Sequence, residues 1–210
     1  MLLGSLIDAI GKTHALDIGT GTGVLSLMVA QKSDRLLIKA IDIDAESLED
    51  CCANVDLSPW KDRVVVVQQD ILLHEPEQHY DLIFSNPPFY QNSLLSSDQR
   101  VATSKHADQL TFDRLFQKVS EMLAKNGSFW AIFPGEYDKE IIEIAVKNNM
   151  KVARQIRIEG VPGRHTRTVF EFSFVPTSAI NEIMVVRDLD GRYSDQYIEL
   201  TKDYHDRSLK

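Results

Sequence analysis

Apolar segments of strand length alternate with segments of helical spacing from about residue 14 to residue 175. The predicted strands cover residues 15–18, 36–43, 64–68, 80–85, 128–133, 152–158 and 168–175. The predicted helices lie between them, at residues 24–30, 44–54, 112–123 and 137–149. Strands that alternate with helices form a mostly parallel sheet with helices on both faces. The pattern therefore predicts a doubly wound α/β sheet of seven strands, closed by a C-terminal antiparallel strand in a hairpin around residues 160–163.

Two stretches do not fit this alternation. Residues 91–110 are polar and irregular, and a loop of that length in a compact domain usually has a function. Residues 180–210 read as a polar tail with two short apolar runs. No Ser/Gly-rich linker divides the alternating segments, so we expect one domain that spans residues 1–210.

Composition narrows the class of protein. Apolar residues make up 43% and charged residues 26%, an ordinary balance for a soluble domain. No apolar run approaches the ~20 residues of a membrane span, and the N-terminus lacks the features of a signal peptide. The adjacent Cys51 and Cys52 are poorly placed to pair and read as reduced thiols, so we expect a cytoplasmic protein without a membrane anchor.

The six histidines lack metal-ligand spacing, so we expect no metal. A net charge of −8 argues against bulk electrostatic binding of nucleic acid but permits a local basic patch.

A rigid polar tip follows the fourth predicted strand. Asn86-Pro87-Pro88-Phe89 comes directly after residues 80–85. Each proline fixes φ and lacks an N–H, and the first one favours an extended conformation at Asn86. The side-chain oxygen of Asn86 and a nearby carbonyl can then point together into a cleft. Two aligned acceptors beside an aromatic face suit a planar –NH2 group, so the tip indicates chemistry on an amino or amide nitrogen.

A glycine turn follows the first predicted strand and opens a helix. The segment Asp17-Ile18-Gly19-Thr20-Gly21-Thr22-Gly23 has the spacing G-x-G-x-G, not the G-x-G-x-x-G of dinucleotide folds. Glycines let the backbone bend sharply and approach a ligand closely. Asp17 would repel a pyrophosphate but suits a cationic amino group. The turn therefore indicates S-adenosylmethionine rather than NAD, and the alternative is a turn whose glycines serve packing alone.

Two further acids end strands at the same edge of the predicted sheet, where ligands of such sheets bind. Asp42 ends the second strand and can accept both ribose hydroxyls, while Asp44 is the better candidate for a helix cap. Asp70 ends the third strand, where it either accepts from an adenine amino group or is a solvated strand end. The predicted cofactor residues are Asp17, Gly19, Gly21, Gly23, Asp42, Ile43, Asp70, Ile71 and Asn86.

The two motifs together resemble those of the class I S-adenosylmethionine-dependent methyltransferases of the small-domain group. The motifs are Asp17-x-Gly19-x-Gly21-x-Gly23 and Ser85-Asn86-Pro87-Pro88-Phe89-Tyr90. Arg100-Val101-Ala102, Lys105-His106 and Phe112-Asp113-Arg114-Leu115 look like the loop and helix of the bacterial enzymes that make N6-methyladenine at position 37 of a valine tRNA. The ending from Tyr193 to Tyr204 is similar to the tail of that family. The resemblance covers essentially all of the chain.

This resemblance implies a Rossmann-like methyltransferase sheet, S-adenosylmethionine as cofactor, tRNA as partner and methyl transfer to an adenine N6. In that reaction Asn86 and the carbonyl of Pro87 accept the two amino hydrogens, and Phe89 with Tyr90 stacks on the base. We expect a monomer. Two alternatives remain open: a glutamine N5-methyltransferase of a translation protein, and a catalytically inactive methyltransferase-fold module that binds RNA.

The N-terminus departs from the family pattern. A glycine-containing segment that helps to cover the cofactor normally precedes the first strand, and here only residues 2–5 resemble it. We therefore expect a truncated start.

A basic segment precedes the end of the alternating region. Lys151, Arg154, Arg157, Arg164 and Arg167 lie in it, with Glu159 as the only acid. The segment is either a solvated hairpin or a patch that binds phosphates. In the second interpretation Arg164 and Arg167 contact RNA. Arg100 and Lys105 of the long loop are further candidates for substrate contact, as is Tyr90.

Overall fold

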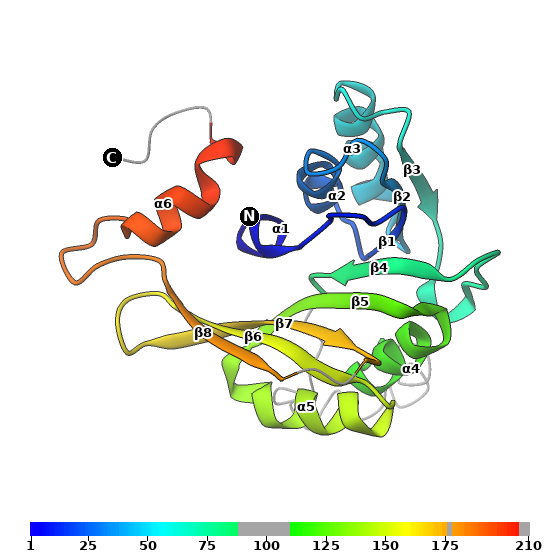
Figure 1. The fold of residues 1–210 in the computed structure, drawn as a ribbon. Coiled ribbons are helices and arrows are strands. Elements are labelled where there is room, and N and C mark those ends of the chain that lie inside the picture. Colours follow the sequence, from blue (N-terminus) through cyan, green and yellow to red (C-terminus); the bar gives the residue numbers. More distant parts are fainter. Residues whose placement is uncertain (88–109, 176–177, 206–210) are drawn as a thin grey trace, which may run out of the picture.

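The computed structural model describes residues 1–87, 110–175 and 178–205, and the strands of these residues form one eight-stranded sheet (Figure 1). The strand order is β3-β2-β1-β4-β5-β7-β6-β8. The strands are β1 (His14–Ile18), β2 (Leu37–Asp42), β3 (Val64–Gln68), β4 (Tyr80–Ser85), β5 (Leu123–Pro134), β6 (Lys151–Glu159), β7 (His165–Ser173) and β8 (Ile180–Val185). Only β7 is antiparallel to its two neighbours. The prediction of a mostly parallel α/β sheet with an antiparallel strand near its C-terminal end is confirmed.

The sheet has one strand more than the sequence predicts. The prediction of a polar tail from residue 180 was wrong for β8, which pairs parallel with β6, and for the helix α6 (Asp195–Thr201) and the 3-10 turn η5 (Lys202–Tyr204) after it. β8 is an edge strand in which only Met184 is buried. Edge strands expose most of their side chains, so β8 lacks the continuous apolar run that marks the central strands.

Helices cover both faces of the sheet, as predicted (Figure 1). One core lies under α1 (Leu2–Leu6), α2 (Val24–Ala30) and α3 (Ala45–Asp56), and the other under α4 (Phe112–Met122) and α5 (Asp138–Lys147). Short 3-10 turns, η1 (Ile71–Leu73) and η4 (Gly135–Tyr137), follow β3 and β5. Helix α4 ends at Met122, one residue before the predicted end, and β5 starts directly at Leu123, five residues before its predicted start.

Helix α1 is a structural element in spite of its five residues. Leu3 and Leu6 lie in the first core, and a Cβ added at Gly4 would meet the Met28 side chain at 2.8–3.0 Å. Lys32 Nζ donates to the carbonyls of Ser5 (2.6 Å) and Ile7 (2.7 Å) at the end of the helix. Burial lowers the pKa of Lys32 to about 8. These contacts fix α1 against α2, beside the carboxyl ends of the central strands.

Residues 1–87, 110–175 and 178–205 contain no sign of a membrane span or of a metal cluster. No helix there is long and apolar enough to cross a membrane. No group of three or more His, Cys, Asp or Glu side chains in the same ranges could hold a metal ion. Cys51 and Cys52 are both free thiols, the first buried and the second exposed, as expected for helix neighbours that point in different directions.

Core packing predicts the effect of one large-to-small change. Phe116 is fully buried and makes edge-to-face contacts with Phe129 and Phe172, with ring centroids 5.4 and 5.1 Å apart. We expect Phe116→Ala to lower the free energy of unfolding by about 3–5 kcal/mol, through lost apolar burial and a cavity. Urea denaturation measures the change, and Val146→Ala on the exposed face of α5 is the control. A loss below 1 kcal/mol at position 116 would contradict this packing.

Candidate functional site

A cleft of about 1160 Å³ opens at the carboxyl ends of the central strands. The amino-terminal residues, the glycine turn, the end of β2 and the segment after β3 form most of its wall. The lining also includes Asn86 and Pro87 after β4, and Leu110, Ile132 and Arg167. This is the edge at which ligands bind in doubly wound sheets, so the fold brings the sequence-predicted site to the expected place.

Four backbone N–H groups of the glycine turn, those of Gly19, Thr20, Gly21 and Gly23, are already paired. Gly19 and Thr20 both donate to the carbonyl of Ile41, at 2.9 and 3.0 Å. Gly21 donates to Asp42 Oδ2 at 2.9 Å, and Gly23 donates to the carbonyl of Thr20 at 3.0 Å. A phosphate-binding turn needs such groups free to face the ligand. The turn is therefore built against β2, and these four N–H groups are not free to bind a phosphate.

Gly23 is required by both its conformation and its surroundings. Its φ is +80°, which side chains rarely adopt, and an added Cβ would lie 2.7 Å from Cys51 Sγ. Gly19 and Gly21 also have positive φ and line the cleft, with open space where a Cβ would stand. Gly23 is not among the described residues that line the cleft. Direct cofactor contact at Gly23 stays a prediction.

Asp17 lies under the turn and is fully buried. Its Oδ2 accepts hydrogen bonds from Thr20 Oγ1 and Ser26 Oγ, both at 2.7 Å, while Oδ1 has no hydrogen-bond partner within the described residues. Burial raises the pKa of Asp17 to about 6, against the effect of the two hydroxyls, and the nearby Asp42 adds to the rise. The cleft lining, so far as it is described, does not include Asp17. Contact with a cofactor amino group therefore stays a prediction, and the observed role is to hold the turn from below.

Asp42 and Ile43 form a polar and apolar pair at the end of β2. Asp42 accepts from the N–H groups of Gly21 (2.9 Å) and Asp44 (3.0 Å), one on each carboxylate oxygen. Each carboxylate oxygen can accept more than one hydrogen bond, so Asp42 keeps acceptor capacity toward the cleft. Ile43 is 65% exposed and lines the cleft beside it. Asp44 caps α3 by accepting from the N–H of Ser47, as the sequence predicted.

Asp70 and Ile71 line the cleft from the segment after β3. Asp70 Oδ1 accepts from the N–H of Leu72 at 2.8 Å and so caps η1. Ile71 is buried in the second core and also contributes to the cleft lining. Asp70 both caps η1 and lines the cleft. The two interpretations, an acceptor for an adenine amino group and a solvated strand end, therefore both stay open.

Asn86 and Pro87 line the same cleft as the glycine turn. Asn86 is exposed and Pro87 is buried. Ser85 Oγ donates to the carbonyl of Ile18 at 2.7 Å, which ties the end of β4 to the end of β1. This bond places the polar tip next to the turn. The other predicted substrate and catalytic residues of this segment, Phe89, Tyr90, Arg100 and Lys105, lie outside the described residues.

The apolar wall of the cleft was missed from the sequence. It comes from residues 1–3 of the amino terminus and from Leu25, Met28 and Ile132. The signal in the sequence was residues 2–5, which resemble part of a family segment that helps to cover the cofactor. A helix of five residues gives too short a pattern to be recognised by period.

The basic segment divides into residues with different roles. Arg167 is exposed and lines the cleft, while Arg164 is exposed in the turn between β6 and β7 and outside the lining as described. Arg154 makes a bidentate ion pair with Glu182 of β8, with Nε–Oε1 and Nη2–Oε2 distances of 2.6 and 3.1 Å. The interpretation of Arg154 as part of a phosphate patch is therefore wrong, because its guanidinium fastens the edge strand.

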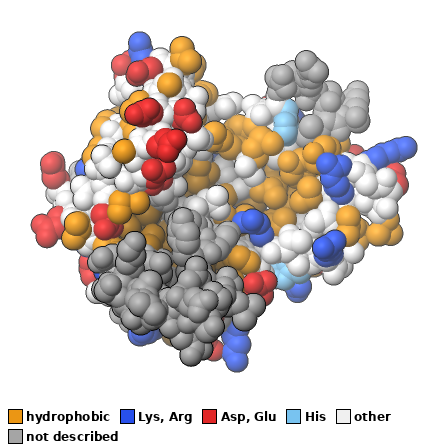
Figure 2. All heavy atoms as spheres, turned by 180° about the vertical axis from the view of Figure 1, so that it is seen from behind, with side chains coloured by type: hydrophobic (Ala, Val, Ile, Leu, Met, Phe, Trp, Pro, Cys, Tyr) orange, Lys and Arg blue, Asp and Glu red, His pale blue; other side chains and the backbone are white. Residues whose placement is uncertain are grey.

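Charge is unevenly distributed over the molecule. Figure 2 shows acidic side chains gathered on the side of α3, and Lys and Arg side chains on the side of β6, β7 and β8, with an apolar surface between them. An anionic partner is thus favoured on the side of β6, β7 and β8 and disfavoured on the side of α3.

Comparisons with known proteins give a consistent result. The model of the family "Methyltransferase small domain" matches residues 1–158. The tRNA1(Val) (adenine(37)-N6)-methyltransferase of Bacteroides thetaiotaomicron is 35% identical over 98% of this chain and 87% of its own length. The protein of the same name from Vibrio parahaemolyticus is 30% identical over 98% and 86%.

Solved structures share the fold at lower identity. A predicted O-methyltransferase from Agrobacterium tumefaciens aligns with a TM-score of 0.74 at 16% identity, over 96% of this chain and 94% of its own. The glycopeptide N-methyltransferase MtfA, solved with S-adenosylmethionine, aligns with a TM-score of 0.59 at 13% identity, over 79% and 89%.

The buried Asp17 predicts a pH dependence of stability. Its folded pKa of about 6 lies above the ordinary 3.8, so between these values the folded state holds the proton that the unfolded state has released. Stability contributed by this group is therefore full below pH 3.8 and is lost as pH rises to 6, by on the order of 3 kcal/mol for a rise from 3.8 to about 6.

The measurement is chemical denaturation of the wild type and Asp17→Asn at several pH values. We expect the stability of the wild type relative to Asp17→Asn to fall as pH rises from 4 to 6 and to stay level from 7 to 8. A constant difference across this range would contradict the raised pKa. Asp113→Asn on α4, where the carboxylate is exposed and paired with Lys147, is the control.

Proposed function

Because the chain belongs to the methyltransferase small domain family and, within it, to the tRNA1(Val) (adenine(37)-N6)-methyltransferases, we propose that it transfers a methyl group from S-adenosylmethionine to N6 of adenine 37 in a valine tRNA. One observation supports this most directly. Asn86 and Pro87 line the same cleft as the glycine turn, Asp42 and Asp70. A polar tip suited to an amino group thus faces the space suited to the cofactor.

The residues of the cleft fit this cofactor. S-adenosylmethionine is a cation without phosphates, and the turn has four paired N–H groups and lies over a buried carboxylate. The unpartnered Oδ1 of Asp17 is a further source of negative potential under the turn. A nucleoside diphosphate would meet the carboxylates of Asp42 and Asp70 in the lining, with the buried Asp17 beneath the turn, and would find the N–H groups of Gly19, Thr20, Gly21 and Gly23 already paired.

Named residues would hold each part of the cofactor. Asp42 has acceptor capacity for the ribose hydroxyls, and Ile43 offers an apolar surface for the adenine ring. Asp70 and Ile71 would contact the adenine from the other side. The wall formed by α1, Leu25 and Met28 would cover the methionine end. When bound, the cofactor supplies the methyl group.

The chain's contribution to the chemistry is orientation. An adenine amino group is a poor nucleophile because its lone pair is delocalised into the ring. Acceptance of its two hydrogens by Asn86 Oδ1 and the Pro87 carbonyl would favour a tetrahedral nitrogen and free the lone pair. Phe89 and Tyr90 would stack on the base. A base in a tRNA loop is already partly unstacked, so its entry costs less than extrusion from a duplex.

The substrate side of the cleft carries Arg167. Its position in the lining, across the sheet from the glycine turn, suits a phosphate near the target base. We also assign substrate contact to Arg164, and to Arg100 and Lys105 of the loop outside the described residues. We propose a monomeric, cytoplasmic enzyme, in keeping with a tRNA substrate.

The activity itself is tested with purified protein, S-adenosylmethionine labelled on the methyl group and an in vitro transcript of a valine tRNA. Digestion to nucleosides should place the label on N6-methyladenosine. Change of adenine 37 to guanine in the transcript should abolish incorporation. Incorporation that persists with guanine at position 37, or label found only on glutamine of an added translation protein, would overturn the proposal.

Asn86→Ala should separate catalysis from cofactor binding. We expect turnover to fall by at least ~100-fold, because one oriented acceptor of this kind contributes about 3 kcal/mol in the transition state. The cofactor Kd should stay within about threefold. Single-turnover rates and calorimetry give the two values, and a variant with near wild-type turnover would contradict the role of Asn86.

Asp42→Ala should have the opposite profile. We expect the cofactor Kd to rise by about 10–100-fold, since hydrogen bonds to a charged acceptor contribute about 1.5–3 kcal/mol. Glu49→Ala, which removes an exposed acid from the same α3 region without touching the described lining, is the matched control. Equal Kd values for wild type and Asp42→Ala, measured by calorimetry, would reduce Asp42 to a structural strand end.

A further inference from the structure

Two loops that are distant in sequence form one surface beside the cleft. They are the β6–β7 turn (residues 159–165) and the β8–α6 loop (residues 186–194), together named here the two-loop surface. The Val186 N–H donates to the Glu159 carbonyl at 2.8 Å, and the Arg187 N–H donates to the Gly160 carbonyl at 3.1 Å. The Gly160 N–H in turn donates to the Arg164 carbonyl at 3.1 Å. Gly160 therefore links Arg164 and Arg187 through its own backbone.

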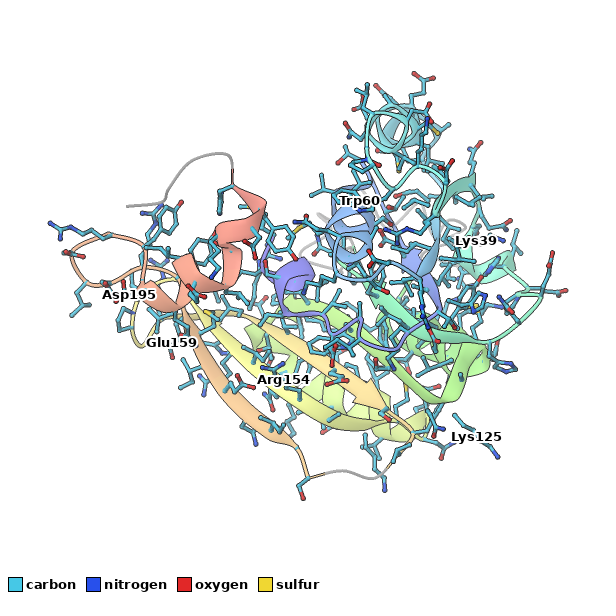
Figure 3. The ribbon with its side chains drawn as sticks, turned by 45° about the horizontal axis from the view of Figure 1, so that its top comes forward. Lys39, Trp60, Lys125, Arg154, Glu159 and Asp195 are labelled. Carbon is cyan, nitrogen blue, oxygen red and sulfur yellow. The ribbon has the colours of Figure 1, made fainter. Side chains whose placement is uncertain are left out.

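The strand missed from the sequence is the cause of this arrangement. β8 runs parallel to β6, so the residues after Val185 emerge at the same edge as the residues after Glu159. That edge also carries the cleft. Figure 3 shows Glu159 at the end of β6 close to Asp195 at the start of α6, while Arg154 lies farther along β6. Residues 186–194 therefore lie at the edge of the sheet where the strands have their carboxyl ends and the cleft opens, which is called here the functional edge.

The guanidinium of Arg187 is held in a fixed position. It lies 4.0 Å from the centroid of the Tyr193 ring, and Tyr193 stacks on Tyr197 with centroids 4.9 Å apart. Arg187 Nη1 also donates to the Gly191 carbonyl at 2.7 Å. An arginine has five N–H donors, so several remain for an anion after this single bond. A cation ordered in advance loses less conformational entropy when it binds.

Charge differs sharply between the two sides of the functional edge. The glycine turn, residues 42–50 and residues 69–71 contain seven carboxylates and neither Lys nor Arg. The two-loop surface together with residues 166–167 contains four arginines and three carboxylates. Two of these carboxylates are engaged locally, since Glu159 accepts from the Gly163 N–H and Asp190 pairs with Arg192 at 3.3 Å. The charges sum to −7 on the cofactor side and to +1 on the side of the two loops, so a polyanion is disfavoured at the first and favoured at the second.

We propose that the two-loop surface binds the phosphate backbone of the RNA substrate, with Arg164 and Arg187 as the phosphate contacts, so that the target nucleotide enters the cleft past Arg167. This inference rests on the proposed function. It gives a role to the ending of the chain, whose β8 and stacked tyrosines place Arg187 where the sequence alone shows a polar tail. The partner is an RNA strand recognised by its phosphates, not by its bases.

The test is binding of an unmodified valine tRNA transcript by the double variant Arg164→Ala/Arg187→Ala, measured by filter binding over a salt series. We expect the Kd to rise by about tenfold, and the slope of log Kd against log salt concentration to fall by about two units, one for each lost phosphate contact. The KM for tRNA should rise in parallel, with kcat unchanged within about threefold. The cofactor Kd should not change, which shows that the variant is folded.

Two further variants make the test specific. Arg35→Ala/Lys61→Ala removes two exposed cations before β2 and β3, at the opposite edge of the sheet, and should bind tRNA like the wild type. Arg164→Lys/Arg187→Lys keeps the positive charge and should retain most of the affinity, although it loses the planar stack on Tyr193.

The outcomes separate this proposal from the proposed function. A wild-type salt slope in the double Ala variant, or an equal loss in the opposite-edge control, would overturn the two-loop surface while tRNA methylation stands. A wild type that binds the transcript through these arginines but forms no N6-methyladenosine would overturn the activity and leave the surface. A wild type that binds no RNA would overturn both.

Discussion

The glycine turn is held to the end of β2 by its own N–H groups, and the rest of the site depends on this attachment. The carbonyl of Ile41 accepts from Gly19 and Thr20, and the carboxylate of Asp42 accepts from Gly21. These bonds fix the turn in the positive-φ conformation that only glycine adopts easily. They also engage three of the amides that could otherwise bind a phosphate. The same attachment therefore shapes the cleft and selects the class of nucleotide that it suits.

A second carboxylate supports the turn from inside the protein. Asp17 binds the hydroxyls of Thr20 and Ser26 and is enclosed so completely that its pKa rises to about 6. A negative charge on the buried Asp17, close to the carboxylate of Asp42, is costly when no ligand is bound. A cation that approaches the turn offsets this cost. The turn thus combines a rigid backbone with an electrostatic preference, and both come from strand ends brought together by the parallel sheet.

The sheet edge also has two sides of opposite charge (Figure 2). The cofactor side, around β1, β2 and β3, is acidic, and the side around β7, β6 and β8 carries the arginines. The polar tip at Asn86 follows β4, between these sides in the strand order. In the proposed reaction, the order of the strands would place the cationic cofactor and the anionic RNA on opposite sides of Asn86. An acidic protein can serve an RNA substrate in this way, because the local charge and not the net charge of −8 acts at the contact.

The sequence by itself determined the features that depend on local chemistry. The alternation of apolar and polar positions gave the central strands β1 to β7, and the spacing of glycines and prolines gave the turn and the tip. Acids at strand ends could be assigned to one edge because parallel strands share their carboxyl ends. The tertiary structure decided what depends on neighbours distant in the chain. β8 is too exposed to show an apolar run, and its place was set by pairing with β6 and by the Arg154–Glu182 ion pair. The same pairing removed Arg154 from the candidate phosphate contacts. The sequence predicts Asp17 in the cleft, but the structure places it in the interior, where it accepts from Thr20 and Ser26. No spacing along the chain reveals this contact.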